Sequence, residues 1–366
     1  MTMWENKKIG DVVDIRRGAS PRPIQNFLSD KGMPWVKIAD ATSDPTRFIS
    51  RTNECIIEDG IKKSVVVEPE TLIVSNSATP GLPKIMKILA CVHDGWLVFS
   101  NYRGITRDFL YYKFIDIRRH LVNQANGSVF QNLKTDIVRE FDIAVPSIET
   151  QNKIVGILSL IDHKIETNIA INDNLEQQAQ AIYASMFIDN ADPAWVQGHL
   201  SDLITVKYGK DHKKLADGSY PVYGSGGIMR HVERPLYDKE SVLIPRKGTL
   251  NNVMYVNQPF WSVDTMFYTE MRLPNVAKFV YHFVKAKDLA SMNAGSAVPS
   301  MTTDILNAME VTIPSASALE EFESLVAPMY QAMQENDIQS SKLSELRDAL
   351  LPKLMSGEID VSGIQL

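Results

Sequence analysis

The sequence has few cysteines and no long apolar segment. Cys55 and Cys91 are the only cysteines among 366 residues, so neither a disulfide framework nor a CxxC metal site can form. No apolar run approaches the ~20 residues that a helix needs to cross a bilayer, and the polar start MTMWENKKIGD is unlike a secretory signal. With 44% hydrophobic and 22% charged residues, these absences predict an ordinary globular protein of the cytoplasm with no membrane partner.

Signatures of common catalytic chemistry are also missing. The sequence has no GxxxxGK[ST] phosphate loop, no HExxH zinc motif and no GxSxG nucleophile elbow. It has no Asn-Pro-Pro-aromatic tetrapeptide of the kind that accompanies adenosylmethionine chemistry, and its seven histidines lack metal-ligand spacing. We therefore expect no catalytic residue, no metal site and no cofactor bound by this chain.

What the sequence does contain is a long internal repeat. The segment GSVFQNLKTDI at Gly127–Ile137 recurs at an offset of 168 as GSAVPSMTTDI at Gly295–Ile305. The register then continues without a gap until Met186 matches Leu354. This period far exceeds the 20–50 residues of solenoid repeats, so it predicts two copies of a whole domain, each with a trailing helix.

The two copies begin alike but differ in length. Lys8–Gly18 matches His199–Gly209 at an offset of 191, so the interior of the second copy is 23 residues shorter. Turn signals separate short β-rich runs, and one helix precedes each GS motif, which predicts two α+β modules. We place the first module at 1–146, a central helix at 147–190, the second module at 191–314 and a distal helix at 315–366. The expected strands are 64–67, 71–74, 96–99, 241–244 and 253–256, and the expected short helices are 109–121 and 277–292.

Both trailing segments carry a heptad pattern. Such a pattern, sustained over more than four heptads, favours a coiled coil of roughly 50 Å over a generic amphipathic helix. The seam positions are Ile154, Leu158, Ile161, Ile165, Leu175, Ala179, Ile182 and Met186 in the first segment, and Phe322, Val326, Met329, Met333, Leu343, Arg347, Leu350 and Leu354 in the second.

A polar break lies midway along both seams, at Asn168 and Asn172 in the first helix and at Asn336 and Ser340 in the second. An antiparallel pairing places Asn168 near Ser340 and Asn172 near Asn336, with a pseudo-two-fold axis between them. Buried polar side chains at seam positions fix register, so we predict an intramolecular antiparallel coiled coil. Alternatively, the middle of each helix is simply less buried.

The charge is unevenly distributed, although the net charge is −6. Residues 1–145 hold 20 Lys and Arg against 17 Asp and Glu, and residues 198–313 hold 13 against 11. The helical segments are acidic, with 2 against 7 in 146–197 and 3 against 9 in 314–366. This distribution attracts a polyanion to the modules and not to the helices. Glu-rich solvated helix faces would give the same pattern.

Both modules contain residues suited to binding double-stranded DNA. Basic side chains in Gly/Pro loops can follow phosphates, and amides can contact adenine edges, although lysine-rich loops are also common on solvated surfaces. The candidates in the first module are Arg16, Arg17, Arg22, Lys62, Lys63, Lys84, Arg103, Asn126 and Gln131. Those in the second module are Lys207, Tyr208, Lys210, Lys213, Lys214, Tyr223, Ser225, Arg246, Lys247 and Thr249.

Over nearly its whole length the chain resembles the specificity subunit of type I restriction-modification systems. Residues 343–359, LSELRDALLPKLMSGEI, resemble the distal repeat of that family, and Ile143–Pro146 followed by Gln151–Ile154 resembles the start of its central repeat. Tyr220–Gly227 and Arg246–Thr249 resemble common target-recognition sequences. The second helix differs at its start, where Ser317-Ala318-Leu319 replaces the usual Gln-rich sequence.

The resemblance implies a division of labour. Two target recognition domains, held in inverted orientation by the helices, would each read one half of a bipartite asymmetric DNA site. Two modification subunits would dock on the helices and methylate adenine at N6 with S-adenosylmethionine. Two restriction subunits would add ATP- and Mg2+-dependent translocation and cleavage.

Two other functions remain open on the sequence. The chain could be a stand-alone nucleic-acid-binding or antirestriction-like protein without methyltransferase partners. It could also be an enzyme with its own nuclease or methyltransferase activity. Adenosylmethionine binding by the isolated chain would support this third function.

Overall fold

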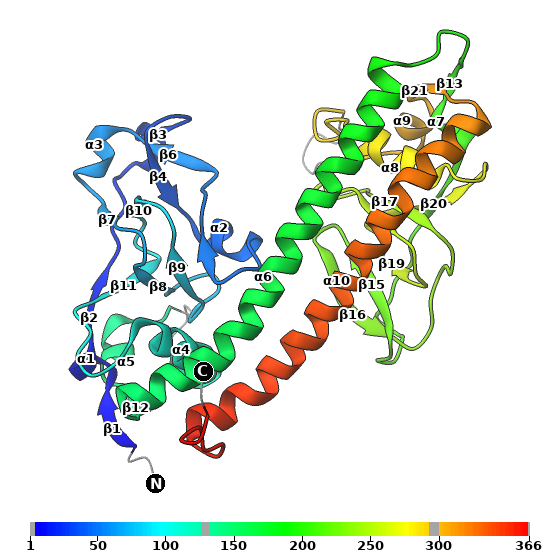
Figure 1. Cartoon of the computed structure of the whole chain (residues 1–366). Helices are drawn as coiled ribbons and strands as arrows, with labels where there is room; N and C mark the ends of the chain where they lie inside the picture. The colour runs from blue at the N-terminus through cyan, green and yellow to red at the C-terminus, as the bar shows by residue number, and fades with distance from the viewer. Residues whose placement is uncertain (1–3, 126–131, 293–299, 365–366) are drawn as a thin grey trace. The chain divides into compact units, whose positions relative to one another are not determined.

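The structure is a computed structural model that describes residues 4–125, 132–292 and 300–364 (Figure 1). The chain forms two compact units. The first comprises residues 1–170 and 336–366, and the second comprises residues 171–335. Each unit therefore consists of one α+β module and one half of each long helix, so the units cross the predicted boundaries between modules and helices.

The first module and the central helix contain most of the strands. In chain order the elements are β1 (Glu5–Lys8), α1 (Ile9–Val12), β2 (Asp14–Arg17), η1 (Ile24–Asn26), β3 (Leu28–Ser29), β4 (Met33–Val36), α2 (Ile38–Ser43), β5 (Phe48–Ile49), β6 (Glu54–Ile56), α3 (Glu58–Ile61), β7 (Val65–Val67), β8 (Leu72–Ser75), β9 (Pro83–Met86), β10 (Ala90–Val92), β11 (Trp96–Ser100), α4 (Arg107–Ala125), α5 (Thr135–Arg139), β12 (Asp142–Val145) and α6 (Ile148–Ala184).

The second module has fewer elements, and the distal helix follows it. They are the π-helical turn η2 (Ser185–Asp189), β13 (Val196–His199), α7 (Leu200–Leu203), β14 (Ile204–Tyr208), β15 (Tyr220–Gly224), β16 (Gly227–Val232), β17 (Ser241–Pro245), β18 (Met254–Val256), β19 (Trp261–Ser262), β20 (Met266–Met271), α8 (Ala277–Lys285), α9 (Thr303–Asn307), β21 (Glu310–Ile313) and α10 (Ala316–Ser356).

The repeat seen in the sequence is a repeat of structure. In the first module β1 pairs antiparallel with β12, and in the second β13 pairs with β21 in the same register, with Glu5 opposite Val145 and Val196 opposite Ile313. The long helices start at Ile148 and Ala316, which correspond to each other in the repeat. The frame at the start and end of each module is thus duplicated residue by residue.

Two sheets and a helical layer form the first unit. The inner sheet has the order β2-β11-β8-β9-β5 and the outer sheet the order β3-β6-β4-β10-β7. Because side chains alternate along a strand, Leu97 and Phe99 of β11 pack on α4 and the long helices, whereas Trp96 and Val98 pack on the outer sheet. The inner sheet is therefore buried on both faces.

The second unit repeats this layering with a smaller outer sheet. Its inner sheet has the order β14-β20-β17-β18, and its outer sheet has only the strands β16-β15-β19. Val242 and Ile244 of β17 pack toward α8 and the long helices, and Leu243 packs toward the outer sheet. The shorter interior predicted for this module thus coincides with an outer sheet of three strands, where the first module has five.

The two long helices run antiparallel within each unit. In the first unit Asp162 of α6 pairs with Arg347 of α10, while Asn168 lies beside Ser340. In the second unit Asn172 donates a hydrogen bond to the carbonyl of Met333 at 3.2 Å, and Phe187 packs on Phe322. Antiparallel pairing is confirmed in both units; the inverted orientation of the modules stays a prediction.

Asn168 forms a buried polar layer in the seam. The residue is 1% exposed, which argues against the alternative of a poorly buried mid-helix. Its Nδ2 donates to the Asn336 carbonyl, to Gln339 Oε1 at 2.9 Å and to Ser340 Oγ at 3.1 Å. Among the described residues its Oδ1 has no hydrogen-bond partner. The layer therefore specifies the register of α6 against α10, and it contains one acceptor, Asn168 Oδ1, without a hydrogen bond.

Replacing Asn168 with leucine should raise the thermal stability of the first unit. The change removes a buried acceptor without a partner, and we expect a gain of about 1 kcal/mol. Differential scanning calorimetry would measure it, and hydrogen exchange along α6 and α10 should rise if register loosens. Ser159→Leu on the same helix, away from the polar layer, is the control. A clear destabilisation by Asn168→Leu would contradict the prediction.

Most predicted secondary structure is present, with one shortened helix. The five predicted strands correspond to β7, β8, β11, β17 and β18. The helix predicted at 277–292 ends at Lys285, because Asp288 then bonds to Asn251 and to the backbone of Ser291 in a loop. No helix in the described ranges is long and apolar enough to cross a membrane.

Candidate nucleic-acid interface

A basic loop follows β2 in the first module and is organised by Asp94. Arg17 Nε donates to the Asp94 carbonyl at 2.7 Å, Ser20 Oγ donates to Asp94 Oδ1 at 2.6 Å, and Arg22 pairs with Oδ2 at 3.1 Å. Burial acts to raise the pKa of Asp94, but the Ser20 hydrogen bond, its own backbone amide and the two arginines lower it below its usual value. Asp94 is therefore an anion that positions two exposed arginines.

Three other basic residues near this loop lie beside the outer sheet: Arg16 on β2 of the inner sheet, and Lys62 and Lys63 in the turn between α3 and β7. Arg16 donates to the carbonyl of Val66 at 3.1 Å, and Ser64 Oγ donates to the carbonyl of Ala19 at 2.9 Å. These contacts bring the Lys62–Lys63 turn close to the loop. Lys63 Nζ lies 4.7 Å from the centre of the Phe27 ring, while Lys62 pairs with Asp59 on its own helix.

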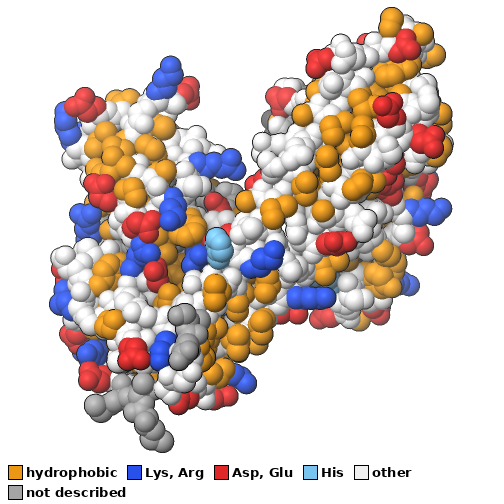
Figure 2. All heavy atoms as spheres, viewed as in Figure 1, with side chains coloured by type: hydrophobic (Ala, Val, Ile, Leu, Met, Phe, Trp, Pro, Cys, Tyr) orange, Lys and Arg blue, Asp and Glu red, His pale blue; other side chains and the backbone are white. Residues whose placement is uncertain are grey.

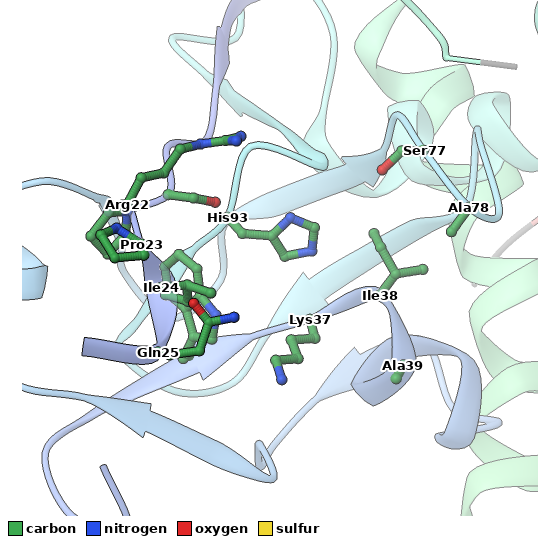
Figure 3. Close-up of a pocket in the computed structure, with 13 residues that line it drawn as sticks. Arg22, Pro23, Ile24, Gln25, Lys37, Ile38, Ala39, Ser77, Ala78 and His93 are labelled. Carbon is green, nitrogen blue, oxygen red and sulfur yellow. The ribbon is translucent and has the colours of Figure 1, made fainter. Parts of the chain in front are cut away.

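A cavity of about 830 Å3 opens beside this loop (Figure 3). Apolar walls come from Pro21, Pro23, Ile24, Trp35, Ile38, Ala39 and Ala78, and polar groups come from Ser20, Arg22, Gln25, Lys37, Ser77 and His93. Figure 3 shows the His93 ring between the Arg22–Gln25 segment and Ser77. Its volume lies within the range of ligand sites, and its walls are apolar with few polar groups, as is usual for them.

His93 presents a neutral imidazole to this cavity. Its Nδ1 accepts a hydrogen bond from the Gly95 amide at 2.8 Å, which leaves the proton of the neutral ring on Nε2. Burial lowers the pKa of His93, and the nearby Asp94 only partly opposes this effect. The ring is thus an uncharged donor at neutral pH, next to the cations of Arg22 and Lys37.

Two candidates of the first module have structural roles instead. Lys84 is 4% exposed, and its ammonium donates to the carbonyls of Asp44 and Thr46; burial lowers its pKa. The prediction that Lys84 contacts DNA is wrong, because its charge is turned inward.

Arg103 bonds to Asp14 and to the carbonyls of Gly10, Asp11 and Asn101. These bonds hold Arg103 at the end of β2 opposite to Arg17. Asn126 and Gln131 lie outside the described residues.

In the second module several candidates lie around the Arg246–Thr249 loop, which follows β17 of the inner sheet. The guanidinium of Arg246 lies 5.4 Å from the centre of the Tyr208 ring, and Tyr208 is 52% exposed. Asn252 Nδ2 donates to the Ser225 carbonyl at 2.8 Å. Gly248 has a φ of +86°, and a Cβ there would lie 2.6 Å from Ser225 Oγ. The Arg246–Thr249 loop therefore requires a glycine to contact the hairpin turn that holds Ser225.

Three lysines of this module, Lys210, Lys213 and Lys214, border the outer sheet of β16, β15 and β19. The Lys210 carbonyl accepts a hydrogen bond from Trp261 of β19 at 2.8 Å, which places Lys210 at one edge. Arg230 of β16 donates to the Leu215 carbonyl at 3.0 Å, which places the segment with Lys213 and Lys214 at the other edge. Both of these lysines, together with Lys247 and Thr249, are exposed.

Two further candidates of the second module are already engaged within the protein. Lys207 pairs with Glu270 on the neighbouring strand at 3.5 Å. Tyr223 is 9% exposed and packs on Phe260, while its hydroxyl accepts a hydrogen bond from Gln258. The prediction that Tyr223 contacts DNA is therefore corrected: the hairpin buries its ring in the core between the sheets.

Polar triads fasten each module to both long helices. In the first unit the Tyr112 hydroxyl of α4 donates to Asp162 of α6 at 2.6 Å, and Arg347 of α10 pairs with the same carboxylate at 3.0 Å. In the second unit His282 of α8 contacts Gln180 of α6 at 2.7 Å and Tyr330 of α10 at 2.9 Å. Asp162 and Tyr330 occupy equivalent positions of the repeat, because each is the fifteenth residue of its long helix.

The difference at the start of the second helix is also explained by packing. Gln151 is fully buried and its amide bonds to the carbonyls of Gly104 and Pro146 and to the amide of Thr106. Its counterpart Leu319 is 2% exposed in the core of the second unit. Gln151 and Leu319 thus both pack inside their own units, one through hydrogen bonds and the other through apolar contacts.

Comparison with known proteins agrees with this architecture. The family model of the type I restriction modification DNA specificity domain matches twice, over residues 1–177 and 194–324. The type I restriction enzyme MjaIX specificity subunit of Methanocaldococcus jannaschii is 24% identical, over 98% of this chain and 94% of that protein. The EcoprrI specificity subunit of Escherichia coli is 20% identical, over 87% of each.

A solved structure shows the same fold. The S subunit of a type I restriction-modification system from M. genitalium aligns with a TM-score of 0.57 and 18% identity, over 97% of this chain and 96% of that one. Because the family model covers most of the sequence, the chain belongs to the type I restriction modification DNA specificity family. It is a specificity subunit for DNA sequence recognition, and its family domain is not a catalytic one.

Some residues near the candidate interface were missed in the sequence. Lys37, His93 and Trp35 line the cavity but stand alone in their segments without a motif. Asp94 was missed because it acts through Arg17 and Arg22, which are more than seventy positions away in the sequence. Ile228 and Met229 are exposed apolar residues, and an apolar pair in a β-rich run usually indicates core.

Proposed function

We propose that this subunit reads a bipartite, asymmetric site on double-stranded DNA, with one module for each half-site. The observation that carries the proposal is the contrast between a duplicated frame and unlike outer sheets, five-stranded in the first module and three-stranded in the second. Basic residues gather beside each outer sheet, as phosphate contacts require. Because the sheets differ while the frame does not, the two half-sites have different sequences.

The long helices would hold the modules in inverted orientation and bind two modification subunits. Figure 2 shows hydrophobic side chains interspersed along the exposed face of the long helices. Leu160, Ile338 and Leu346 of the first unit are among the exposed large hydrophobic residues. Apolar residues exposed on an acidic surface suit a protein partner better than DNA. S-adenosylmethionine would be bound by the modification subunits, and ATP and Mg2+ by two restriction subunits.

Co-expression with the modification subunit of its own restriction-modification system tests this function. We expect a stable complex whose product DNA carries N6-methyladenine in both halves of a split motif with an unread spacer, detected by methylation sequencing. An isolated chain that binds its full site without any partner would support a stand-alone DNA-binding protein instead. Adenosylmethionine binding by the isolated chain would contradict the non-catalytic assignment.

Phosphate contacts should show a distinctive salt dependence. We expect Lys213→Ala in the complex to weaken binding to all DNA sequences alike and to reduce the slope of log K against log salt by about 1. Fluorescence anisotropy over a range of salt concentrations measures the slope. Lys8→Ala, at an exposed lysine on β1 outside the long helices and the outer sheets, is the matched control and should change nothing. An effect confined to one base pair would refute the phosphate assignment of Lys213.

A further inference from the structure

The hairpin of β15 and β16 displays two apolar residues next to each other. Ile228 is 54% exposed and Met229 is 60% exposed. Adjacent residues of a regular strand point to opposite faces, so in a strand on a core one of them should be buried. In this hairpin neither is, although Val222 and Val232 of the same two strands are fully buried.

A β-bulge explains this arrangement. Tyr223 pairs with Ile228 and Val222 pairs with Arg230, so Met229 is an extra residue without an opposite partner. Bulges bend a strand and redirect its side chains, and they are frequent near functional sites. A Cβ at Gly224 would lie 2.5 Å from Met229 Sδ. The glycine therefore leaves room for the methionine, and the hairpin specifies where this side chain lies.

The surroundings of this pair favour a polyanionic partner. At the turn, Ser225 contacts the loop that carries Arg246 and Lys247, through Asn252 and Gly248. Along the outer edge, Arg230 and Glu233 bond to the segment that follows Lys213 and Lys214. Apolar side chains among exposed cations suit DNA, where charge is neutralised at phosphates and methyl groups line the major groove.

We propose that Ile228 and Met229 read thymine methyl groups in the major groove, which makes the β15–β16 hairpin a determinant of the second half-site sequence. This inference rests on the proposed DNA-reading function. A two-stranded ribbon with strands about 4.8 Å apart fits a groove about 12 Å wide. Apolar side chains distinguish thymine by its 5-methyl group, the one apolar group on a major-groove base edge.

The test uses the complex of the full chain with its modification subunit, on the site identified by methylation sequencing. Each thymine of the site is replaced in turn by deoxyuridine, which removes only the methyl group. We expect one or two replacements in one half-site to weaken binding about fourfold, the effect of losing one buried methyl group. In the variants Ile228→Ser and Met229→Gln, which have no methyl group at the end of the side chain, that loss should disappear. Ile188→Ser, at another exposed isoleucine, is the matched control.

Each contrary outcome identifies what fails. If the wild-type complex binds its site but tolerates every replacement, the hairpin inference is wrong and the proposed function stands. If the replacement effect persists in both variants, other residues read the methyl groups. Loss of the modification subunit in the variants, with DNA affinity unchanged, would show that the hairpin contacts protein. If the wild-type complex shows no sequence preference, both proposals fall.

Discussion

Replacing Arg347 with leucine is expected to lower the free energy of unfolding of the first unit by about 3–5 kcal/mol, because it leaves a buried carboxylate without its cation. Asp162 is buried between α4, α6 and α10, and Arg347 pairs with it at 3.0 Å. The remaining Tyr112 hydrogen bond supplies no positive charge. Urea denaturation followed by fluorescence, with Trp4, Trp35 and Trp96 in this unit, measures the loss.

Two controls separate the buried charge from the helix surface. Arg347 also pairs with Asp348 at 2.8 Å, but Asp348 is exposed, so Asp348→Ala should cost less than about 1 kcal/mol. The double variant Arg347→Leu with Asp162→Leu should recover most of the stability, since it removes both charges of this pair together. If Arg347→Leu costs no more than Asp348→Ala, the pair is not a significant anchor between the module and the helices.

Acid is expected to destabilise the second unit between about pH 6.5 and pH 4 because of His282. Burial lowers the pKa of His282 to about 4, against the opposing charge of Glu176 and aided by Lys285. The unfolded chain, in which histidine has a pKa near 6.5, therefore takes up a proton first as the pH falls. The stability due to the neutral ring is complete above pH 6.5 and declines toward pH 4, by about 3 kcal/mol in total.

The hydrogen bonds are also compatible with the neutral ring. Gln180 Oε1 accepts from Nδ1, so Nε2 of the neutral ring accepts from the Tyr330 hydroxyl, whereas protonation of Nε2 would make this hydroxyl the acceptor. His282→Phe should lower stability at neutral pH but flatten its dependence on pH between 6.5 and 4. His231→Gln, on the exposed hairpin, should keep the wild-type dependence. An unchanged slope in His282→Phe would refute the assignment.

The long helices and the duplicated frame are the features that the sequence specified best. Heptad spacing depends only on residues three and four apart on one helix face, so local order suffices to reveal it. The polar positions of the seam gave the antiparallel register as well, and the contact of Asn168 with Ser340 confirms it. The repeat has two constant offsets, one at the start of the modules and one at their end. In the structure they correspond to the equivalent strand pairs β1 with β12 and β13 with β21.

Individual interface residues were less predictable, since the direction of a charged side chain depends on distant partners. Lys84 and Lys213 look alike in sequence, yet one is enclosed by the carbonyls of Asp44 and Thr46 and the other is exposed. For Ile228 and Met229 the error is the reverse, because residues expected to be buried are exposed. They resemble core residues, but a bulge of one residue exposes both.

The sequence by itself indicated the class of protein through its resemblance to a known family. It also determined the two-module organisation and the antiparallel pairing of the helices, because both depend on periodicity that a chain carries along its length. The tertiary structure alone decided which cations are available for DNA and which side chains hold each module to the helices. Those roles depend on burial and on contacts between residues far apart in sequence, such as Tyr112, Asp162 and Arg347. Desolvation makes such contacts energetically important, and only folding determines which groups are desolvated.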